Sequence, residues 1–280
     1  MYEAVNNSIP LTVVSVFIPV LFYFLGLNSN LGDFKELFIE KKSLVSGLII
    51  QLIALPTVGF LMAFIFSESV FATASILILI VPGGHISGLL TYIKRGNLSL
   101  SVFLTSITSL LSPITIVFWL AIISSKFNDY SLNIATSFSQ LLLFVLLPFV
   151  FGIYVKSKFL RFTKIILSPL DKFLKVLIII VSIWTPIDLS TYILENISQS
   201  LTIAFLSLLL IFLSSRFIIH LSKVRRENAI AIQIEALCQN FPIVLGISLA
   251  LGLPEVAIYG IVYYLTSMII VIPYAFIKKY

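Results

Sequence analysis

The chain has 280 residues, of which 59% are hydrophobic and only 11% are charged, whereas about a quarter of the residues in a soluble domain are charged. This composition excludes a soluble domain and indicates an integral membrane protein with little mass outside the bilayer. The net charge of +6 indicates membrane topology rather than binding to nucleic acid, and the single cysteine, Cys238, excludes an internal disulfide.

Apolar runs of about 20 residues predict nine transmembrane helices in a single membrane domain that covers residues 1–280. In chain order the predicted helices cover residues 9–27, 45–66, 71–93, 98–122, 134–156, 168–185, 199–220, 228–251 and 255–277. No basic residue precedes the first run, so we expect that helix to be retained rather than cleaved as a signal peptide.

The basic residues predict the orientation of these helices. Every Lys and Arg except Lys126 falls on one side, in a loop or in the half of a predicted helix nearest that side, and such a bias is typical of the cytoplasmic side. The N-terminus is therefore expected outside and the C-terminus in the cytoplasm, in a plasma or inner membrane. Trp119 and Trp184 fall at the outer ends of their helices, as interfacial tryptophans often do.

The second and third predicted helices carry the first unusual features. Gln51 lies five residues before Pro56 in the second helix. The third helix is interrupted by Pro82-Gly83-Gly84-His85. Pro82 has no N–H, so the carbonyl four residues earlier loses its helical partner, and the two glycines make unwinding cheap. The sequence therefore predicts a break at this point.

A stripe of hydroxyl side chains follows along the fourth helix. Its members are spaced at helical intervals and comprise Ser101, Thr105, Thr108 and Ser112, while Ser87 directly follows the break in the third helix. Neutral oxygens of this kind are ligands that hard cations prefer. Alternatively, each hydroxyl bonds to the carbonyl four residues earlier in its own helix or packs between helices.

Glu235, in the eighth predicted helix, is the only carboxylate well inside any of the long apolar stretches rather than near an end. A charge at mid-bilayer costs about 2.5–3.5 kcal/mol, so we expect a cation, a proton or a buried partner to compensate it. Gln239 lies four residues on, hence on the same face, whereas Gln233 points away from it. The helix is then interrupted at residues 239–242, where Pro242 leaves the carbonyl of Cys238 without its helical partner.

The two breaks occupy corresponding positions in oppositely oriented halves of the chain, a pattern typical of inverted-repeat transporters. We expect an all-α polytopic membrane protein with a first repeat of four helices over residues 9–122 and a second of five over residues 134–277. The first repeat lacks its first helix, because the mate of the fifth helix would precede residue 1. Two simple proline kinks are the alternative.

His85 and His220 are the only histidines. His220 is expected at the membrane interface. His85 lies inside the first break, where two roles remain open. It is either a neutral histidine hydrogen-bonded to freed backbone or a protonatable partner of Glu235.

These segments resemble the bile acid–sodium symporter (BASS) family. The resemblance rests on residues 82–97 followed by Ser101 and Thr105, on residues 235–240, and on Gln51 with Pro56. It runs over almost the whole chain from about residue 12. It implies two discontinuous crossing helices in a core domain, a separate panel domain, and transport by alternating access driven by two sodium ions.

The resemblance also implies two cation sites. The first would use Ser87, Ser101, Thr105 and Glu235. The second would use Gln51, Glu235, Gln239 and the carbonyls of Ala236 and Cys238. Asn240 and His85 would face the substrate.

The chain departs from the family pattern at both breaks. Where the family usually has Thr-Ala-Ser-Asn, this chain has His85-Ile86-Ser87-Gly88, and Gly88 offers no side-chain ligand to the first sodium. At the second break, Leu237 replaces the glycine of the family pattern. A protonated His85 would supply the positive charge that the first sodium normally brings.

The sequence thus predicts a secondary active transporter of a small organic anion in a lipid bilayer, with Na⁺ as coupling ion, possible coupling to a proton, and no other cofactor. The alternative is a sodium-independent or proton-coupled carrier resembling the auxin efflux carriers. An intramembrane serine protease using Ser87 is disfavoured because neither His85, two residues away, nor His220, in another helix, is placed as its base. A channel is disfavoured because no filter motif is visible.

Overall fold

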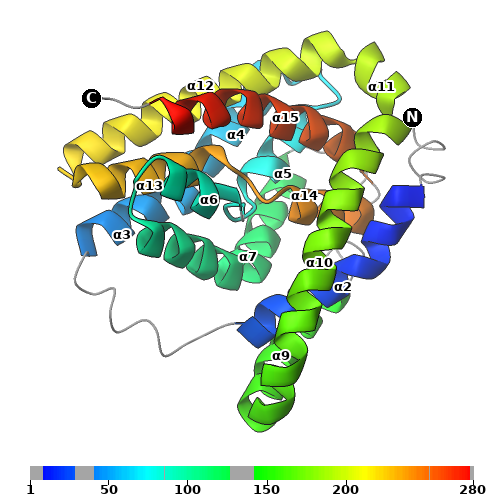
Figure 1. Cartoon of the computed structure of the whole chain (residues 1–280). Coiled ribbons are helices and arrows are strands. Elements are labelled where there is room, and N and C mark those ends of the chain that lie inside the picture. Colours follow the sequence, from blue (N-terminus) through cyan, green and yellow to red (C-terminus); the bar gives the residue numbers. More distant parts are fainter. Residues whose placement is uncertain (1–8, 29–40, 85, 127–141, 252, 278–280) are drawn as a thin grey trace. The chain divides into compact units, whose positions relative to one another are not determined.

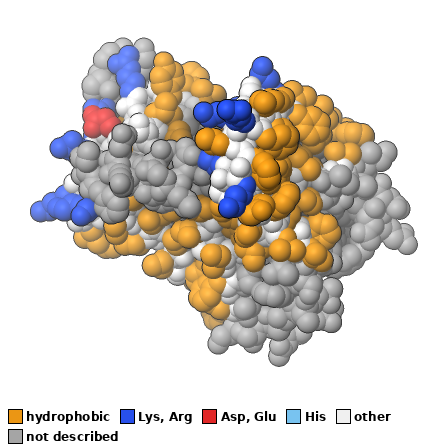
Figure 2. Space-filling model, turned by 90° about the horizontal axis from the view of Figure 1, so that it is seen from below, with side chains coloured by type: hydrophobic (Ala, Val, Ile, Leu, Met, Phe, Trp, Pro, Cys, Tyr) orange, Lys and Arg blue, Asp and Glu red, His pale blue; other side chains and the backbone are white. Residues whose placement is uncertain are grey.

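The computed structural model describes residues 9–28, 41–84, 86–126, 142–251 and 253–277, and within these ranges every regular element is a helix. Four described segments are long and apolar enough to cross a membrane: Lys41–Ile65, Leu98–Ile116, Ile197–Leu221 and Glu255–Phe276. The all-α membrane class predicted from the composition is confirmed. The described surface fits a lipid environment, because many large hydrophobic side chains are exposed and they cover much of the described part of the face in Figure 2.

The chain divides into two compact units, which are described separately below. Unit 1 comprises Met1–Ser29, Pro113–Glu195 and Pro242–Ile258. Unit 2 comprises Asn30–Ser112, Asn196–Phe241 and Tyr259–Tyr280. Three helices contribute residues to both units: α7 (Leu98–Lys126), α14 (Phe241–Leu251) and α15 (Pro254–Phe276).

Unit 1 is built on the packing of α2 against α9 and α10. Its own elements are α2 (Ile9–Asn28), the π-helix η3 (Leu142–Leu146), α9 (Leu147–Lys158), α10 (Leu160–Asp188) and α11 (Ser190–Glu195). The α2 and α9 backbones approach closely through Gly26 and Gly152. A Cβ at Gly152 would lie 2.3 Å from the carbonyl oxygen of Tyr23. Small residues allow such close helix crossings in membranes, where van der Waals packing drives helix association.

Unit 2 contains both breaks predicted from the sequence. Its elements are α3 (Lys41–Ile49), the π-helix η2 (Ile50–Ala54), α4 (Leu55–Ile65), α5 (Ala72–Leu79), α6 (Ile86–Ile93), α12 (Ile197–Leu221) and α13 (Arg226–Leu237). The first three, α3, η2 and α4, form one continuous helix. Its last part, α4, packs against the separate helix α5. Helix α13 packs against α3, α6 and α12 and is therefore surrounded by neighbours of its own unit (Figure 1).

The helix bounds agree with the predicted ones except in three places. The second break covers residues 238–240, so Pro242 does not lie within it; Pro242 is the second residue of α14, where a missing N–H leaves no bond unmade. Helix α10 begins at Leu160 rather than near residue 168, because an amphipathic segment extends the helix beyond its apolar run. The short helix α11 was not predicted. His85 and the start of the fifth predicted helix lie outside the described residues.

The contact between α2 and α9 leads to a first prediction. Gly152→Ala would place a methyl group against the backbone of α2, and overpacking of this kind costs about 1–3 kcal/mol. The free energy of unfolding should fall by that amount, measured by thermal or denaturant unfolding in detergent. Gly88→Ala is the control, because a Cβ there meets no atom closer than 3.6 Å. Equal stability of the two variants would contradict the close packing of α2 and α9.

Candidate functional site

The two breaks in unit 2 cross and satisfy each other's backbone groups. The N–H of Gly84 donates to the carbonyl of Cys238 at 2.7 Å, and the N–H of Asn240 donates to the carbonyl of Pro82 at 3.0 Å. Between these two bonds, Gly83 and Gln239 form an isolated antiparallel bridge. The Cys238 carbonyl, which lies in the second break and has no helical partner, thus finds a donor in the other broken helix. This pairing satisfies backbone groups that two unwound segments would otherwise bury without partners.

The glycines of the first break are required by this crossing. A Cβ at Gly83 would lie 1.9 Å from Oε1 of Glu235, and one at Gly84 would lie 2.7 Å from the carbonyl oxygen of Gln239. The sequence suggested that these glycines ease unwinding. The structure adds that they leave room for a carboxylate and for a second backbone.

Glu235 lies in the last turn of α13 beside the crossing, and its side chain is buried. Three hydroxyl groups donate to its carboxylate. Ser87, in the first turn of α6, donates to Oε2 at 2.6 Å. From consecutive turns of α7, Ser101 donates to Oε2 at 3.1 Å and Thr105 to Oε1 at 2.5 Å. The four residues expected at the first cation site therefore meet within unit 2.

All three hydroxyl donors are neutral. Within the described ranges, the ion pair found joins Lys175 to Asp171, and no basic side chain pairs with Glu235. Hydroxyl groups orient toward a carboxylate but cannot cancel its charge, so burial of the ionised form stays costly unless a cation or a proton accompanies it. The cluster is thus chemically suited to accept a small cation.

Gln51 and Gln239 form a second group around the carbonyls at the end of α13. Gln51 lies in the π-helix η2, where the N–H of Leu55 reaches back five residues to Ile50, and its Nε2 donates to the carbonyl of Glu235 at 3.0 Å. Gln239 Nε2 donates to the carbonyl of Ala236 at 3.0 Å. π-Turns of this kind often occur at functional sites.

The amide oxygens of Gln51 and Gln239 are buried and find no hydrogen-bond donor among the described residues. Buried polar atoms without partners are rare in proteins, so each calls for an explanation. Because these oxygens lie beside the backbone carbonyls at the negative end of the α13 dipole, they form a donor set that fits a hard cation. These are the residues expected at the second cation site.

Other residues of the predicted constellation have different roles. Thr108 and Ser112 bond to carbonyls of their own helix, so the hydroxyl stripe of α7 divides between site and packing. Gln233 donates to Ser215 of α12, away from the carboxylate, as its position predicted. Asn240 is buried, with its backbone in the crossing. The placement of His85 is not described.

Sequence reasoning missed several supporting residues. Ser267 of α15 donates to the carbonyl of Leu237 at 2.9 Å and satisfies another orphan group at the end of α13. At its other end, Asn228 accepts a bond from Asn97 and donates to Ser43, both at 2.8 Å. The feature of the sequence that could have identified these residues is a polar side chain within an otherwise apolar helix. These three hydrogen bonds hold α13, and with it Glu235, at both ends.

A second buried carboxylate was also missed. Glu255, in the first turn of α15 and in unit 1, is buried, and its Oε1 lacks a hydrogen-bond partner among the described residues. Glu255 is the first residue of the predicted helix 255–277, where an exposed acid is ordinary, so nothing in the sequence indicated that it would be buried.

Comparison with known proteins places this geometry in context. The family model described as Sodium Bile acid symporter family matches residues 15–203, a stretch that contains Gln51, Ser87, Ser101 and Thr105 and ends before Glu235. The chain is 30% identical over 147 residues to an uncharacterized sodium-dependent transporter, YocS, of Bacillus subtilis, covering 52% of this chain and 45% of that protein. It is 25% identical over 172 residues to an ileal sodium/bile acid cotransporter of Cricetulus griseus, covering 60% and 49% of the two chains. The chain thus spans about half the length of these relatives.

The hydroxyl cluster yields a second prediction. Ser101→Ala removes one donor from a buried carboxylate, and hydrogen bonds to charged groups contribute about 1.5–3 kcal/mol. We expect the free energy of unfolding to fall by that amount, measured in detergent without added sodium. Ser106→Ala in the same helix is the matched control, because the exposed Ser106 hydroxyl bonds only to the carbonyl of Val102. A loss no greater than that of the control would mean that Ser101 does not support the carboxylate.

Proposed function

Because the chain belongs to the sodium bile acid symporter family, we propose that it is a secondary active transporter that couples the movement of an organic anion to sodium by alternating access. The observation that carries the proposal is the buried carboxylate of Glu235, which neutral oxygen atoms surround and no basic side chain within the described ranges balances. A bound sodium ion would supply the missing charge. One matched relative is named a sodium-dependent transporter and another a sodium/bile acid cotransporter. These names support sodium as the coupling ion.

The proposal assigns two sodium sites around Glu235. The first consists of Ser87, Ser101, Thr105 and Glu235, whose hydroxyl groups would turn from the carboxylate toward the ion. Gly88 contributes no side chain there, so a proton on His85 is the alternative source of positive charge.

The second site consists of Gln51, Glu235, Gln239 and the carbonyls of Ala236 and Cys238. Its support lies in the two amide oxygens that lack donors. The carbonyl of Ala236 now accepts from Gln239, and a half-turn of that amide, which would exchange its oxygen and nitrogen, would open this carbonyl to the ion. Sodium coupling through this site requires no residue from outside unit 2.

The organic anion is proposed on electrostatic grounds. Helices α6 and α14 both begin next to the crossing, at Ile86 and Phe241, and helix N-termini carry partial positive charge that favours anionic groups. Asn240 and His85 are the substrate-facing residues of this proposal. A bile acid is named for one relative, but nothing at this site selects it over another organic acid.

We also propose the finer architecture expected from the sequence: nine transmembrane helices, with inverted repeats over residues 9–122 and 134–277. The division into two units supports a core and a panel domain. Unit 2 contains the crossing and Glu235, whereas α2, α9 and α10 form the body of unit 1. Alternating access would then consist of movement of one unit against the other.

A proton-coupled, sodium-independent carrier is the second candidate. It is favoured by the same carboxylate, because a protonated Glu235 would also remove the buried charge. The two candidates differ in the role of the amide oxygens, which only a metal ion would use.

Transport itself gives a third prediction. In proteoliposomes, uptake of labelled organic acids, including a bile acid, should be driven by an inward sodium gradient and not by a potassium gradient of equal size. Glu235→Gln should lower the sodium-driven rate about tenfold or more, because a lost ligand worth about 1.4 kcal/mol weakens binding tenfold. Glu227→Gln, at an exposed acid of the same helix, should leave the rate unchanged. Uptake that needs no sodium and persists in Glu235→Gln would reject the coupling.

Sodium binding gives a fourth prediction that does not require the substrate. Sodium should stabilise the purified protein relative to potassium, by about 2.7 kcal/mol when its concentration is 100 times Kd. Gln51→Leu should raise the apparent Kd for sodium at least tenfold, in thermal unfolding titrations. Gln233→Leu is the matched control, since Gln233 is also buried with a partnerless oxygen in the described structure but bonds to Ser215. If both variants or neither lost sodium affinity, Gln51 would not be a ligand.

A further inference from the structure

Helix α10 differs from the other long helices in the way its residues divide along its length. Its first half, residues 160–175, contains Arg161, Lys164, Lys172 and Lys175. Its second half, residues 176–187, contains no charge. At about 1.5 Å per residue, the uncharged half is about 18 Å long, whereas the hydrocarbon core of a bilayer is about 30 Å thick. The uncharged half alone is therefore too short to span the membrane, so a bilayer-spanning α10 would bring some of its basic residues to the headgroup level or deeper.

The four basic residues lie on one face of α10. Their offsets of 0, 3, 11 and 14 residues bring them back to nearly the same direction around the helix, so they form a stripe about 21 Å long. All four are exposed. Lys175 is matched by Asp171 at 2.6 Å, and no other Asp or Glu occurs between Asp129 and Asp188. The stripe is therefore strongly positive.

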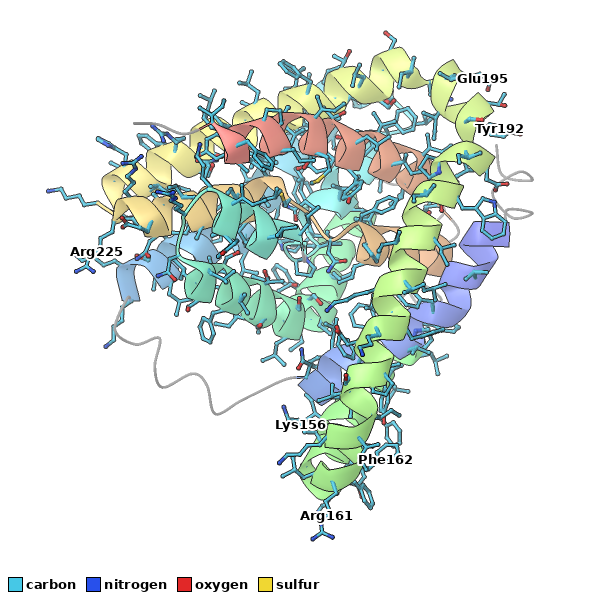
Figure 3. All side chains as sticks on the ribbon, in the orientation of Figure 1. Lys156, Arg161, Phe162, Tyr192, Glu195 and Arg225 are labelled. Atoms are coloured by element: carbon cyan, nitrogen blue, oxygen red, sulfur yellow. The ribbon has the colours of Figure 1, made fainter. Side chains whose placement is uncertain are left out.

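An exposed apolar stripe runs beside the basic one. It consists of Phe162, Phe173 and Val176, and Phe173 and Val176 are both 57% exposed. The opposite side, which includes the buried Thr163 and Leu174, lies toward the rest of unit 1, where α10 packs on α2 and α9. Figure 3 shows Arg161 pointing away from the end of the α9–α10 corner, with Phe162 beside it. Adjacent basic and apolar stripes match the two parts of a phospholipid, the phosphate and the acyl chain.

We propose that this face of α10, comprising Arg161, Lys164, Lys172, Phe162 and Phe173, binds anionic phospholipids of the cytoplasmic leaflet. Their phosphate groups lie along the basic stripe, and their acyl chains cover the aromatic side chains. A lipid surface is favoured over a soluble anion because the apolar stripe would gain nothing from the latter. Each basic residue near an anionic membrane surface adds to the attraction, so the stripe provides selective rather than incidental binding. The proposal is independent of sodium coupling.

Fluorescence quenching by brominated lipids tests the proposal on the full chain. Phe162→Trp is made in a background in which Trp119 and Trp184 are replaced by Phe, so that it introduces the sole tryptophan, and the protein is reconstituted into phosphatidylcholine. Dibrominated phosphatidylglycerol at about one-tenth of the lipid should quench the introduced indole several-fold more than the same amount of dibrominated phosphatidylcholine. Equal quenching by the two lipids would overturn the proposal.

A charge-matched pair of variants isolates the stripe. Arg161→Gln with Lys164→Gln and Lys172→Gln should remove the preference for phosphatidylglycerol, lowering its apparent affinity at least tenfold. The control variant removes the same number of charges from exposed positions in unit 2, by Lys42→Gln with Lys223→Gln and Arg226→Gln. Its apparent affinity for phosphatidylglycerol should change less than twofold. An equal loss in both variants would show that net charge alone attracts the lipid.

A second measurement covers the case in which the reconstituted variant is unstable. In detergent, phosphatidylglycerol should raise the thermal unfolding midpoint of the unsubstituted protein more than phosphatidylcholine does. Glycerol phosphate at the same concentration should not. If glycerol phosphate stabilised the protein equally, the stripe would be a site for soluble anions and the lipid proposal would be wrong.

Discussion

The burial of one carboxylate is the constraint on which the rest of unit 2 depends. Glu235 is held at a depth where an ionised group is costly, and its neighbours are arranged to reduce that cost without removing it. Three hydroxyl groups orient toward it, while no basic side chain in the described ranges neutralises it. An incompletely compensated charge is useful to a transporter, because a fully satisfied one would have no affinity left for a mobile ion.

The crossing of the two breaks solves a second problem, which is the fate of unpaired backbone groups in a membrane. Each break supplies a donor to the other, and Gly83 and Gly84 allow the approach. The same crossing sets the position of Glu235, since the carboxylate occupies the space that a side chain at Gly83 would fill. Backbone pairing and the position of the carboxylate are therefore coupled by geometry. A change that separated the two breaks would also rearrange the ligands of the proposed sites.

The division of the chain gives the two units different tasks. Unit 2 contains every described residue of the proposed sodium sites. Unit 1 is held together by the close contact of α2 with α9 and carries the basic face of α10. This contrast fits a transporter in which one part binds the ion and another is anchored in the bilayer. If lipid headgroups held unit 1 in place, unit 2 would be able to move relative to it.

The sequence by itself determined the membrane class, the two breaks and the unusual carboxylate, because long apolar runs, prolines and a solitary acid are local signals that need no partner to be recognised. The full sets of candidate ligands came from the resemblance to a family. The sequence located most helix ends, but it placed the second break too far along the chain and started α10 too late. Only the tertiary structure decided that Gly84 pairs with Cys238, that the hydroxyl stripe of α7 divides between Glu235 and its own backbone, and that Ser267 closes the end of α13. These contacts join residues far apart in the chain, and a polar side chain in an apolar helix has several possible partners until packing selects one.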